Sequence, residues 1–155
     1  MFLIFDTETT GLPLNYNAPL TDFNNWPRVV QLAWQIHDEK GKFVKAENHV
    51  IKPEGFTIPI NASIVHGITT EHALNVGKSL ADVLDLFYED LNKSKYVVGH
   101  NVKFDRDITG CEFLRIKGFD PFEGKNFVDS CTEKTANFCK ISMGNRYKKP
   151  KLEEI

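Results

Sequence analysis

The chain has 155 residues, of which 41% are hydrophobic and 12 are phenylalanine, enough for one domain with a substantial core. Its formal net charge of −2 argues against a strongly basic packaging protein and excludes no class of enzyme. The three cysteines, Cys111, Cys131 and Cys139, have no C-x-x-C spacing, which argues against a structural zinc site and favours a reducing compartment. No apolar stretch is long enough for a membrane span, so we expect a cytoplasmic protein without a membrane partner.

The chain opens with four apolar residues, 2–5, that predict a short strand buried on both faces. Asp6, Thr7 and Glu8 follow directly, and 9–11 form a turn with the sequence Thr-Thr-Gly. Because side chains alternate along a strand, Asp6 and Glu8 are expected on one side and Thr7 on the other. At an effective dielectric of about 20, two such charges ~4 Å apart repel by about 4 kcal/mol. A shared proton, a divalent cation or plain solvation would relieve this repulsion.

A polar segment, 13–27, then connects the first strand to the second. It is long for such a connection, and it carries the aromatic residues Tyr16, Phe23 and Trp26. These aromatics either pack on the base of their own loop or, in one case, stack on a nucleotide base. Residues 28–37 alternate, with one predicted face formed by Val30, Leu32, Trp34 and Ile36. Together with 42–51 they predict a hairpin, and with the first strand a three-stranded meander.

The next part of the chain alternates between helical and extended patterns. Residues 52–77 are interrupted by proline and glycine, and we expect only short helical pieces there. An amphipathic helix is predicted over 79–91, a strand over 96–99 and a helix over about 102–117. Asp105 falls in the first turn of that last helix, where a carboxylate interacts favourably with the helix dipole even without any chemical role.

The last third predicts a fifth strand over 126–130 that contains Asp129, for which we expect a structural role. A short helix is expected over 132–140. The segment 140–151 is basic and contains no acid, so it is either a solvated loop or a contact for phosphates.

Two stretches resemble sequence motifs of the DEDD family of 3′–5′ exonucleases. Residues 5–12, Phe-Asp-Thr-Glu-Thr-Thr-Gly-Leu, look like its first motif, and 97–105, Val-Val-Gly-His-Asn-Val-Lys-Phe-Asp, look like its second. The resemblance is strongest to the histidine-containing DEDDh subgroup, related to the proofreading epsilon subunit of bacterial DNA polymerase III. Residues 64–69, Ile-Val-His-Gly-Ile-Thr, resemble a family segment that approaches the terminal nucleotide.

The resemblance covers nearly the whole chain and implies one exonuclease domain over 1–155. The implied fold is α/β and ribonuclease H-like, a mixed five-stranded sheet flanked by helices with the first strand at its centre. The implied activity is hydrolysis of phosphodiesters at the 3′ end of DNA or RNA, with release of nucleoside 5′-monophosphates. It requires two divalent cations, Mg²⁺ or Mn²⁺. The implied partner is a single-stranded or frayed nucleic acid 3′ end, and a DNA polymerase is a further candidate.

By resemblance, three acids form the catalytic and metal-binding set: Asp6, Glu8 and Asp105. Asp6 would bridge both ions, Glu8 would hold the ion that binds the attacking water, and Asp105 would support the second ion. The residues expected to bind substrate are Thr9, Thr10, Gly11, Leu12, His66 and Asn101. By itself, His66 is as well explained by packing or capping as by a substrate contact.

One part of the family pattern is missing. A third motif, a His followed by an Asp on a C-terminal helix, should supply the general base and a fourth carboxylate, yet no His follows His100. Residues 149–155 resemble the segment that precedes this motif. We therefore expect a truncated domain that lacks its C-terminal helix, is inactive or nearly so, and leaves apolar sheet surface uncovered at about 25 cal/mol per Å².

Two alternatives stay open. A nucleic-acid or protein binding module could use an exonuclease-like fold without catalysis, which the missing motif favours and the three acids oppose. A phosphatase of the haloacid dehalogenase type also begins with an apolar strand and an acid. It needs Asp-x-Asp, however, and Glu8 stands in place of the second Asp.

Overall fold

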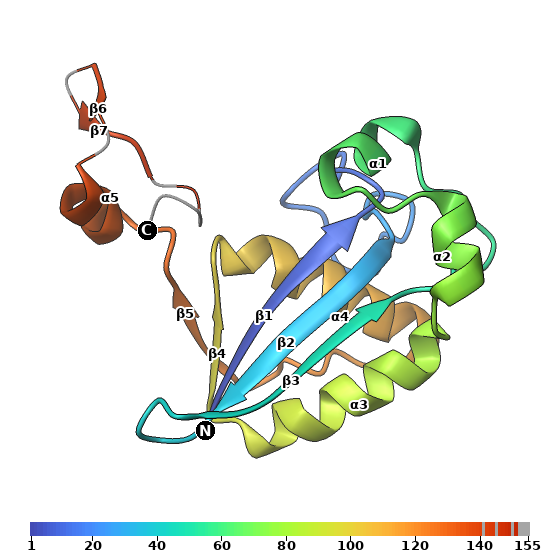
Figure 1. Ribbon diagram of the computed structural model, residues 1–155, viewed down its shortest axis with the longest axis horizontal. Helices are drawn as coiled ribbons and strands as arrows, with labels where there is room; N and C mark the ends of the chain where they lie inside the picture. Colours follow the sequence, from blue (N-terminus) through green and yellow to red (C-terminus); the bar gives the residue numbers. More distant parts are fainter. Residues whose placement is uncertain (141, 145, 150, 152–155) are drawn as a thin grey trace.

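A computed structural model describes residues 1–140, 142–144, 146–149 and 151. Its centre is a five-stranded sheet with the order β3-β2-β1-β4-β5 (Figure 1). The strands are β1 (Phe2–Thr9), β2 (Val29–His37), β3 (Phe43–Val50), β4 (Tyr96–Gly99) and β5 (Asn126–Asp129). The first three strands are antiparallel neighbours, whereas β4 lies parallel to β1 and β5 parallel to β4. The predicted mixed α/β sheet with the first strand at its centre is therefore confirmed.

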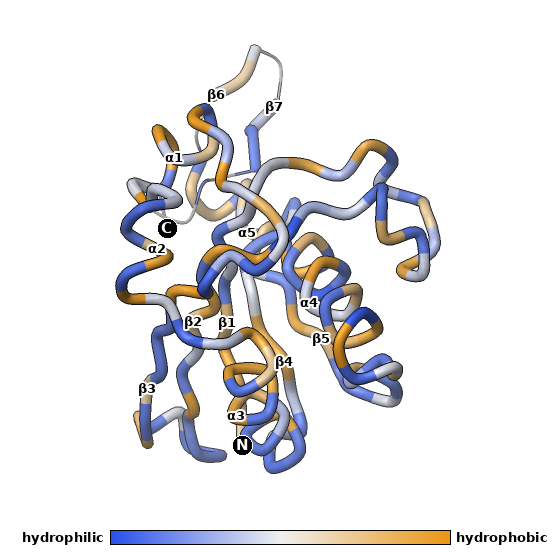
Figure 2. Tube along the Cα trace, turned by 90° about the vertical axis from the view of Figure 1, so that its right-hand side faces the viewer, coloured by the Kyte–Doolittle hydropathy of each residue, from blue (hydrophilic) through white to orange (hydrophobic). Residues whose placement is uncertain are grey.

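Two long helices, α3 (Leu80–Lys93) and α4 (Val102–Lys117), pack on the same face of this sheet. Leu3 and Phe5 of β1 and Trp34 of β2 form the core with apolar residues of both helices. Figure 2 shows hydrophobic and hydrophilic residues alternating along α3 and α4, as helices with one buried side require. The predicted buried face of β2 is confirmed for Leu32, Trp34 and Ile36.

Val30 departs from the predicted alternation. The β1–β2 register shifts between Glu8 and Thr9, so Thr9 pairs with Val29 and one residue is skipped. This bulge places Val30 in a second cluster, with Ile58, Ala62, Ile68 and Ala73. The cluster includes residues of two short helices, α1 (Ile60–His66) and α2 (Thr70–Val76). These are the helical pieces expected within 52–77. In Figure 1 α1 lies beside the end of β1.

The expectation that β1 is buried on both faces is wrong. Leu3 and Phe5 are buried, but Ile4 on the opposite face is 39% exposed. The reason is that α3 and α4 both cover the Leu3 face. Within the described residues, the Ile4 face borders a hollow of about 430 Å³ that reaches from β3 across β2 and β1 to the end of β4.

The last described elements lie beyond the β5 edge of the sheet in Figure 1. They are α5 (Glu133–Cys139), which confirms the helix predicted there, and two strands that pair with each other, β6 (Ser142–Met143) and β7 (Arg146–Tyr147). The small hairpin was not predicted. Of the segment 149–155, which resembles the part of the family that precedes the third motif, only 149 and 151 are among the described residues.

All three cysteines are free, with Cys111 buried and Cys131 and Cys139 half-buried. Across the ranges that the structure describes, no helix combines the length and the apolar character needed to cross a bilayer.

Candidate functional site

The candidate site lies where the parallel strands of the sheet end. The carboxyl ends of β1, β4 and β5 meet at the same edge, because all three strands run in one direction. Asp6 and Glu8 stand near the end of β1, Asn101 follows β4, and Asp129 ends β5. In open α/β sheets, binding sites commonly form at the carboxyl ends of the strands, where the connections after two neighbouring strands go to opposite sides.

Asp105 reaches this edge from the first turn of α4. The paired residues of β1 and β4 run from Phe2–Tyr96 to Ile4–Val98, so the β1 backbone beyond them is free of β4. Thr7 donates its backbone N–H and its hydroxyl to Oδ1 of Asp105 at 3.0 and 2.6 Å. The carboxyl of Asp105 is thereby fixed against β1, and the residue is only 3% exposed.

The three acids are held in an environment that disfavours their charges. Burial raises the pKa of Asp105 to about 7; the negative charge of Asp6 adds to the rise, and the hydrogen bonds from Thr7 oppose it. Burial also raises the pKa of Asp6, and the pKa of Glu8 is raised by burial and then by the charge of Asp6. Acids that repel one another in a partly desolvated place are a common mark of functional sites.

The donor set suits a hard cation such as Mg²⁺ or Mn²⁺, because it consists of carboxylate oxygens. Asp6 and Glu8 share the Ile4 face of β1, and Asp6 borders the open hollow on that face. Asp105 offers Oδ2, since Thr7 takes Oδ1. As placed, however, the described His, Cys, Asp and Glu residues include no group of three or more that could hold a metal ion. The pair on β1 fits a cation, and the three-acid set stays a prediction.

His66 ends α1 close to Glu8. Its Nδ1 accepts a hydrogen bond from the backbone N–H of Ile68 at 3.1 Å, so in the neutral ring the proton belongs to Nε2. That Nε2 is buried and has no hydrogen-bond partner in the described part of the chain. The charge of His66 also lowers the pKa of Glu8 against the larger effect of burial. A buried donor without a hydrogen-bond partner is rare in folded proteins, and it marks His66 as a candidate functional residue.

The turn after β1 is held by its own hydrogen bonds. Thr9 is buried and its hydroxyl donates to the carbonyl oxygen of Gly11 at 2.7 Å, so its side chain shapes the turn. The hydroxyl of Thr10 accepts from the backbone N–H of Arg28 at 2.9 Å. Gly11 has φ +153°, which L side chains rarely adopt, and a Cβ there would meet open space. Leu12 follows with its side chain exposed.

Asn101 connects β4 to α4 in a left-handed conformation, φ 61° and ψ 44°. Its backbone N–H donates to Oδ1 of Asp129 at 2.9 Å, and the same oxygen accepts from the N–H of Cys131 at 2.8 Å. The structural role expected of Asp129 is thus borne out, because this carboxylate ties the end of β5 to the start of α4. Asparagine tolerates the left-handed region better than most residues.

Thr7, His100 and Ser130 line or support the site, although the sequence patterns predict no role for them. Nδ1 of His100 lies 2.9 Å from the hydroxyl of Ser130, which in turn donates to the carbonyl oxygen of Gly99 at 3.3 Å. His100 borders the same hollow as Asp6 and lowers the pKa of that acid. His100 lies within the second motif, so its place in the sequence could have marked it as a site residue. The bond of Thr7 to Asp105 joins residues 98 positions apart, and no local pattern predicts it.

Solved structures of similar fold include two complexes of E. coli exonuclease I. The complex with a dT13 oligonucleotide has a TM-score of 0.71 and 23% identity, over 92% of this chain and 30% of that one. The complex with a dA16 oligonucleotide has a TM-score of 0.70 and 23% identity, over 89% of this chain and 30% of that one. The chain thus spans about a third of the length of these proteins, and at this identity the likeness establishes the fold.

No curated protein matches the sequence significantly. The model of the exonuclease family RNase_T matches residues 3–154, which include both motifs, the turn after β1 and the segment around His66. The fold and this match over nearly the entire chain agree, and the chain belongs to the RNase_T exonuclease family.

Proposed function

We propose that this domain belongs to a metal-dependent 3′–5′ exonuclease that removes nucleoside 5′-monophosphates from the 3′ end of a nucleic acid strand. The observation that carries the proposal is the pair Asp6 and Glu8 on one face at the end of β1, with Asp105 bonded to the intervening Thr7 and the pKa of each acid raised by burial. A surface that bound phosphates without chemistry would gain nothing from three acids, since they repel the phosphate charge.

Each acid has a separate part in the proposed reaction. Asp6 and Glu8 would hold the cations from β1, and Asp105 would complete the set from α4 in its deprotonated form, against the burial that favours its proton. Two bound Mg²⁺ or Mn²⁺ ions would activate the attacking water and stabilise the leaving 3′ oxygen. Thr7 positions Asp105, because both of its donors end on Oδ1 and leave Oδ2 for the site.

The turn after β1 and the end of α1 would receive the terminal nucleotide. The backbone at Gly11 permits close approach, and the exposed side chain of Leu12 is free to wedge against a base. The unpartnered Nε2–H of His66 can donate to a phosphate oxygen. Thr10 and Asn101 would contribute further polar groups. Thr9 acts through the turn that its hydroxyl shapes.

We further infer that the protein falls in the DEDDh subgroup, related to the epsilon subunit, acts on single strands and works beside a DNA polymerase in a reducing compartment such as the cytoplasm. The complexes of exonuclease I with oligonucleotides support the choice of single strands. No His follows His100 in the sequence, so the general base of this subgroup has no counterpart here. The 155-residue chain is therefore expected to be inactive or nearly so.

The test is degradation of a 5′-labelled single strand by a version of the protein extended through the third motif. A ladder that shortens from the 3′ end with Mn²⁺ and disappears with EDTA is expected. Asp6→Ala should lower the rate by a factor of 100 or more, on the order of what one preorganised electrostatic contact contributes. The 155-residue chain should give no ladder, and a rate equal to that of the extended protein would refute the inactive-fragment proposal.

A second candidate is a non-catalytic binding module on the same fold. It is favoured by the finding that the described residues form no three-ligand metal group and that Asp105 spends one oxygen on Thr7. The same assay separates the two functions. Binding of the labelled strand by the extended protein, without any cleavage in Mg²⁺ or Mn²⁺, would establish the module.

A further inference from the structure

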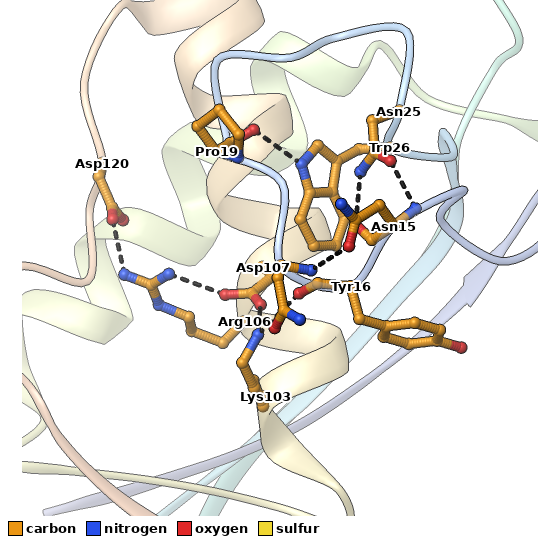
Figure 3. Close-up of polar contacts among 10 residues, drawn as sticks. Asn15, Tyr16, Pro19, Asn25, Trp26, Lys103, Arg106, Asp107 and Asp120 are labelled. Carbon is orange, nitrogen blue, oxygen red and sulfur yellow. Dashed lines mark hydrogen bonds and ion pairs between the residues drawn. The ribbon is translucent and has the colours of Figure 1, made fainter.

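The long segment between β1 and β2, residues 13–27, is fixed in place. Asn15 donates its backbone N–H to the side chain of Asn25 at 2.7 Å, and the Asn25 amide donates back to the carbonyl oxygen of Asn15 at 3.0 Å. The indole N–H of Trp26 donates to the carbonyl oxygen of Pro19 at 3.1 Å. Figure 3 shows these contacts beside the first turns of α4. The segment is therefore a preformed part of the surface.

Helix α4 also holds this segment. Lys103 donates to the carbonyl oxygen of Tyr16 at 3.3 Å, and Arg115 donates to that of Trp26 at 2.8 Å. Lys103 is paired with Asp107, which also binds Arg106. The ammonium of Lys103 carries three donors, and these two contacts leave one for a ligand.

The three aromatics of the segment behave differently. Trp26 is buried against the loop base, and Phe23 packs on the guanidinium of Arg115, 5.5 Å from the ring centre. Tyr16 is 49% exposed, and the structure gives its ring no aromatic or cation contact among the described residues. In Figure 3 the ring extends away from the hydrogen-bonded network. Packing on the loop base explains why Trp26 is in this segment, but it does not explain the exposed Tyr16.

The exposed ring of Tyr16 borders a hollow of about 170 Å³ together with Asn101, Lys103 and Phe104. Asn101 connects this hollow to the candidate site, because its neighbour His100 borders the larger hollow that contains Asp6. The small hollow therefore combines an aromatic ring, an amide and a cation, and it continues the edge where the 3′ end is proposed to bind. These are the groups that recognise one nucleotide of a single strand. Asp107 also lines the small hollow, and the charge of this acid is balanced by Lys103 and Arg106.

We propose that Tyr16, Asn101 and Lys103 form a subsite for a nucleotide upstream of the 3′-terminal one. The base stacks on the ring of Tyr16, and the remaining donor of Lys103 binds the adjacent phosphate. Stacking accepts any base, so the subsite selects single strands without selecting their sequence. This inference rests on the proposed function, since it assumes that a strand enters at the Asp6 edge.

The test is equilibrium binding of a 5′-fluorescein-labelled thymidine hexanucleotide to the 155-residue chain, by fluorescence anisotropy in Ca²⁺, with dTMP as competitor. Tyr16→Ala should weaken hexanucleotide binding about fivefold or more, and Tyr16→Trp should restore it, because one stacked base contributes that much. Binding of dTMP should stay unchanged, since the mononucleotide occupies the terminal position alone. Phe43→Ala is the control, an exposed aromatic on β3 that borders neither hollow.

Hexanucleotide binding by Tyr16→Ala equal to that of the unchanged chain would overturn the subsite. So would an equal loss of dTMP and hexanucleotide affinity, because that result means a general disturbance of the site. If the unchanged chain binds neither ligand, the proposed function itself fails, and the subsite fails with it.

Discussion

Asp105 shows how a single buried acid connects stability to the proposed chemistry. Thr7 fixes its carboxyl by hydrogen bonds, and the negative charge of Asp6 repels it. Burial raises its pKa from 3.8 to about 7. The folded protein therefore keeps this proton up to about pH 7, whereas the unfolded chain releases it near pH 4. Between these values the folded state binds more protons, so the free energy of unfolding falls as pH rises.

The prediction is that Asp105→Asn removes most of this pH dependence. One pKa unit corresponds to about 1.4 kcal/mol, so the gain at pH 8 is at most about 4 kcal/mol. Asparagine keeps an oxygen for the donors of Thr7 and carries no charge. Urea unfolding in EDTA at pH 5 and pH 8 measures the effect. If the free energy of unfolding fell as steeply with pH in the variant as in the unchanged protein, the prediction would be wrong. A weaker pH dependence is expected to remain, because the pKa values of Asp6 and Glu8 are also raised.

At the scale of elements, one buried carboxylate joins α4 to the start of β2. Oε1 of Glu112 accepts from Nε of Arg28 at 2.8 Å and from the backbone N–H of Val29 at 3.0 Å. Arg115 lies 3.2 Å from Oε2, close enough for an ion pair although the geometry does not make a hydrogen bond. Glu112 is fully buried, so its negative charge balances the positive charges of Arg28 and Arg115.

We expect Glu112→Ala to lower the free energy of unfolding by about 3 to 5 kcal/mol, because it leaves buried partners without their charge. Thermal unfolding followed by circular dichroism measures this loss. Glu89→Ala on the exposed side of α3 is the matched control, with an expected change within about 0.5 kcal/mol. Similar melting temperatures for the two variants would show that Glu112 is not required to hold α4 against the start of β2.

At the scale of the whole molecule, the sheet is covered unequally. Val97 and Val128 stand on neighbouring strands, yet Val97 is buried under the helices and Val128 is 46% exposed. Adjacent residues of a strand point to opposite faces, and the paired residues Val98 and Val128 share the face of Ile4. This face gives the domain an apolar surface next to the candidate site.

Val97→Lys should lower the free energy of unfolding by about 3 kcal/mol or more, since it places an unpaired charge in the core. Val128→Lys should change it by less than about 0.5 kcal/mol and reduce binding of an apolar fluorescent dye to the folded chain. Urea unfolding and dye fluorescence test both statements. Equal destabilisation by the two variants would mean that both faces of the sheet are covered.

Local patterns in the sequence were sufficient for most elements. Alternation in 28–37 predicted β2, and helical spacing predicted α3 and α4, because burial of one side follows directly from the period of the backbone. The two motifs also predicted that Asp6, Glu8 and Asp105 belong to one site. Periodicity could not predict the bulge that moves Val30 to another cluster, since a bulge depends on how two strands pair.

The sequence by itself predicted the exonuclease family and the order of the main strands and helices, and it singled out the acids of the candidate site, because these depend on short stretches of neighbouring residues. Only the tertiary structure decided that Thr7 holds Asp105, that one face of β1 is open and that Tyr16 stands exposed beside Asn101. Each of these features joins residues far apart in the chain. Their positions follow from the packing of α4 on the sheet and on the 13–27 segment, which no local pattern contains.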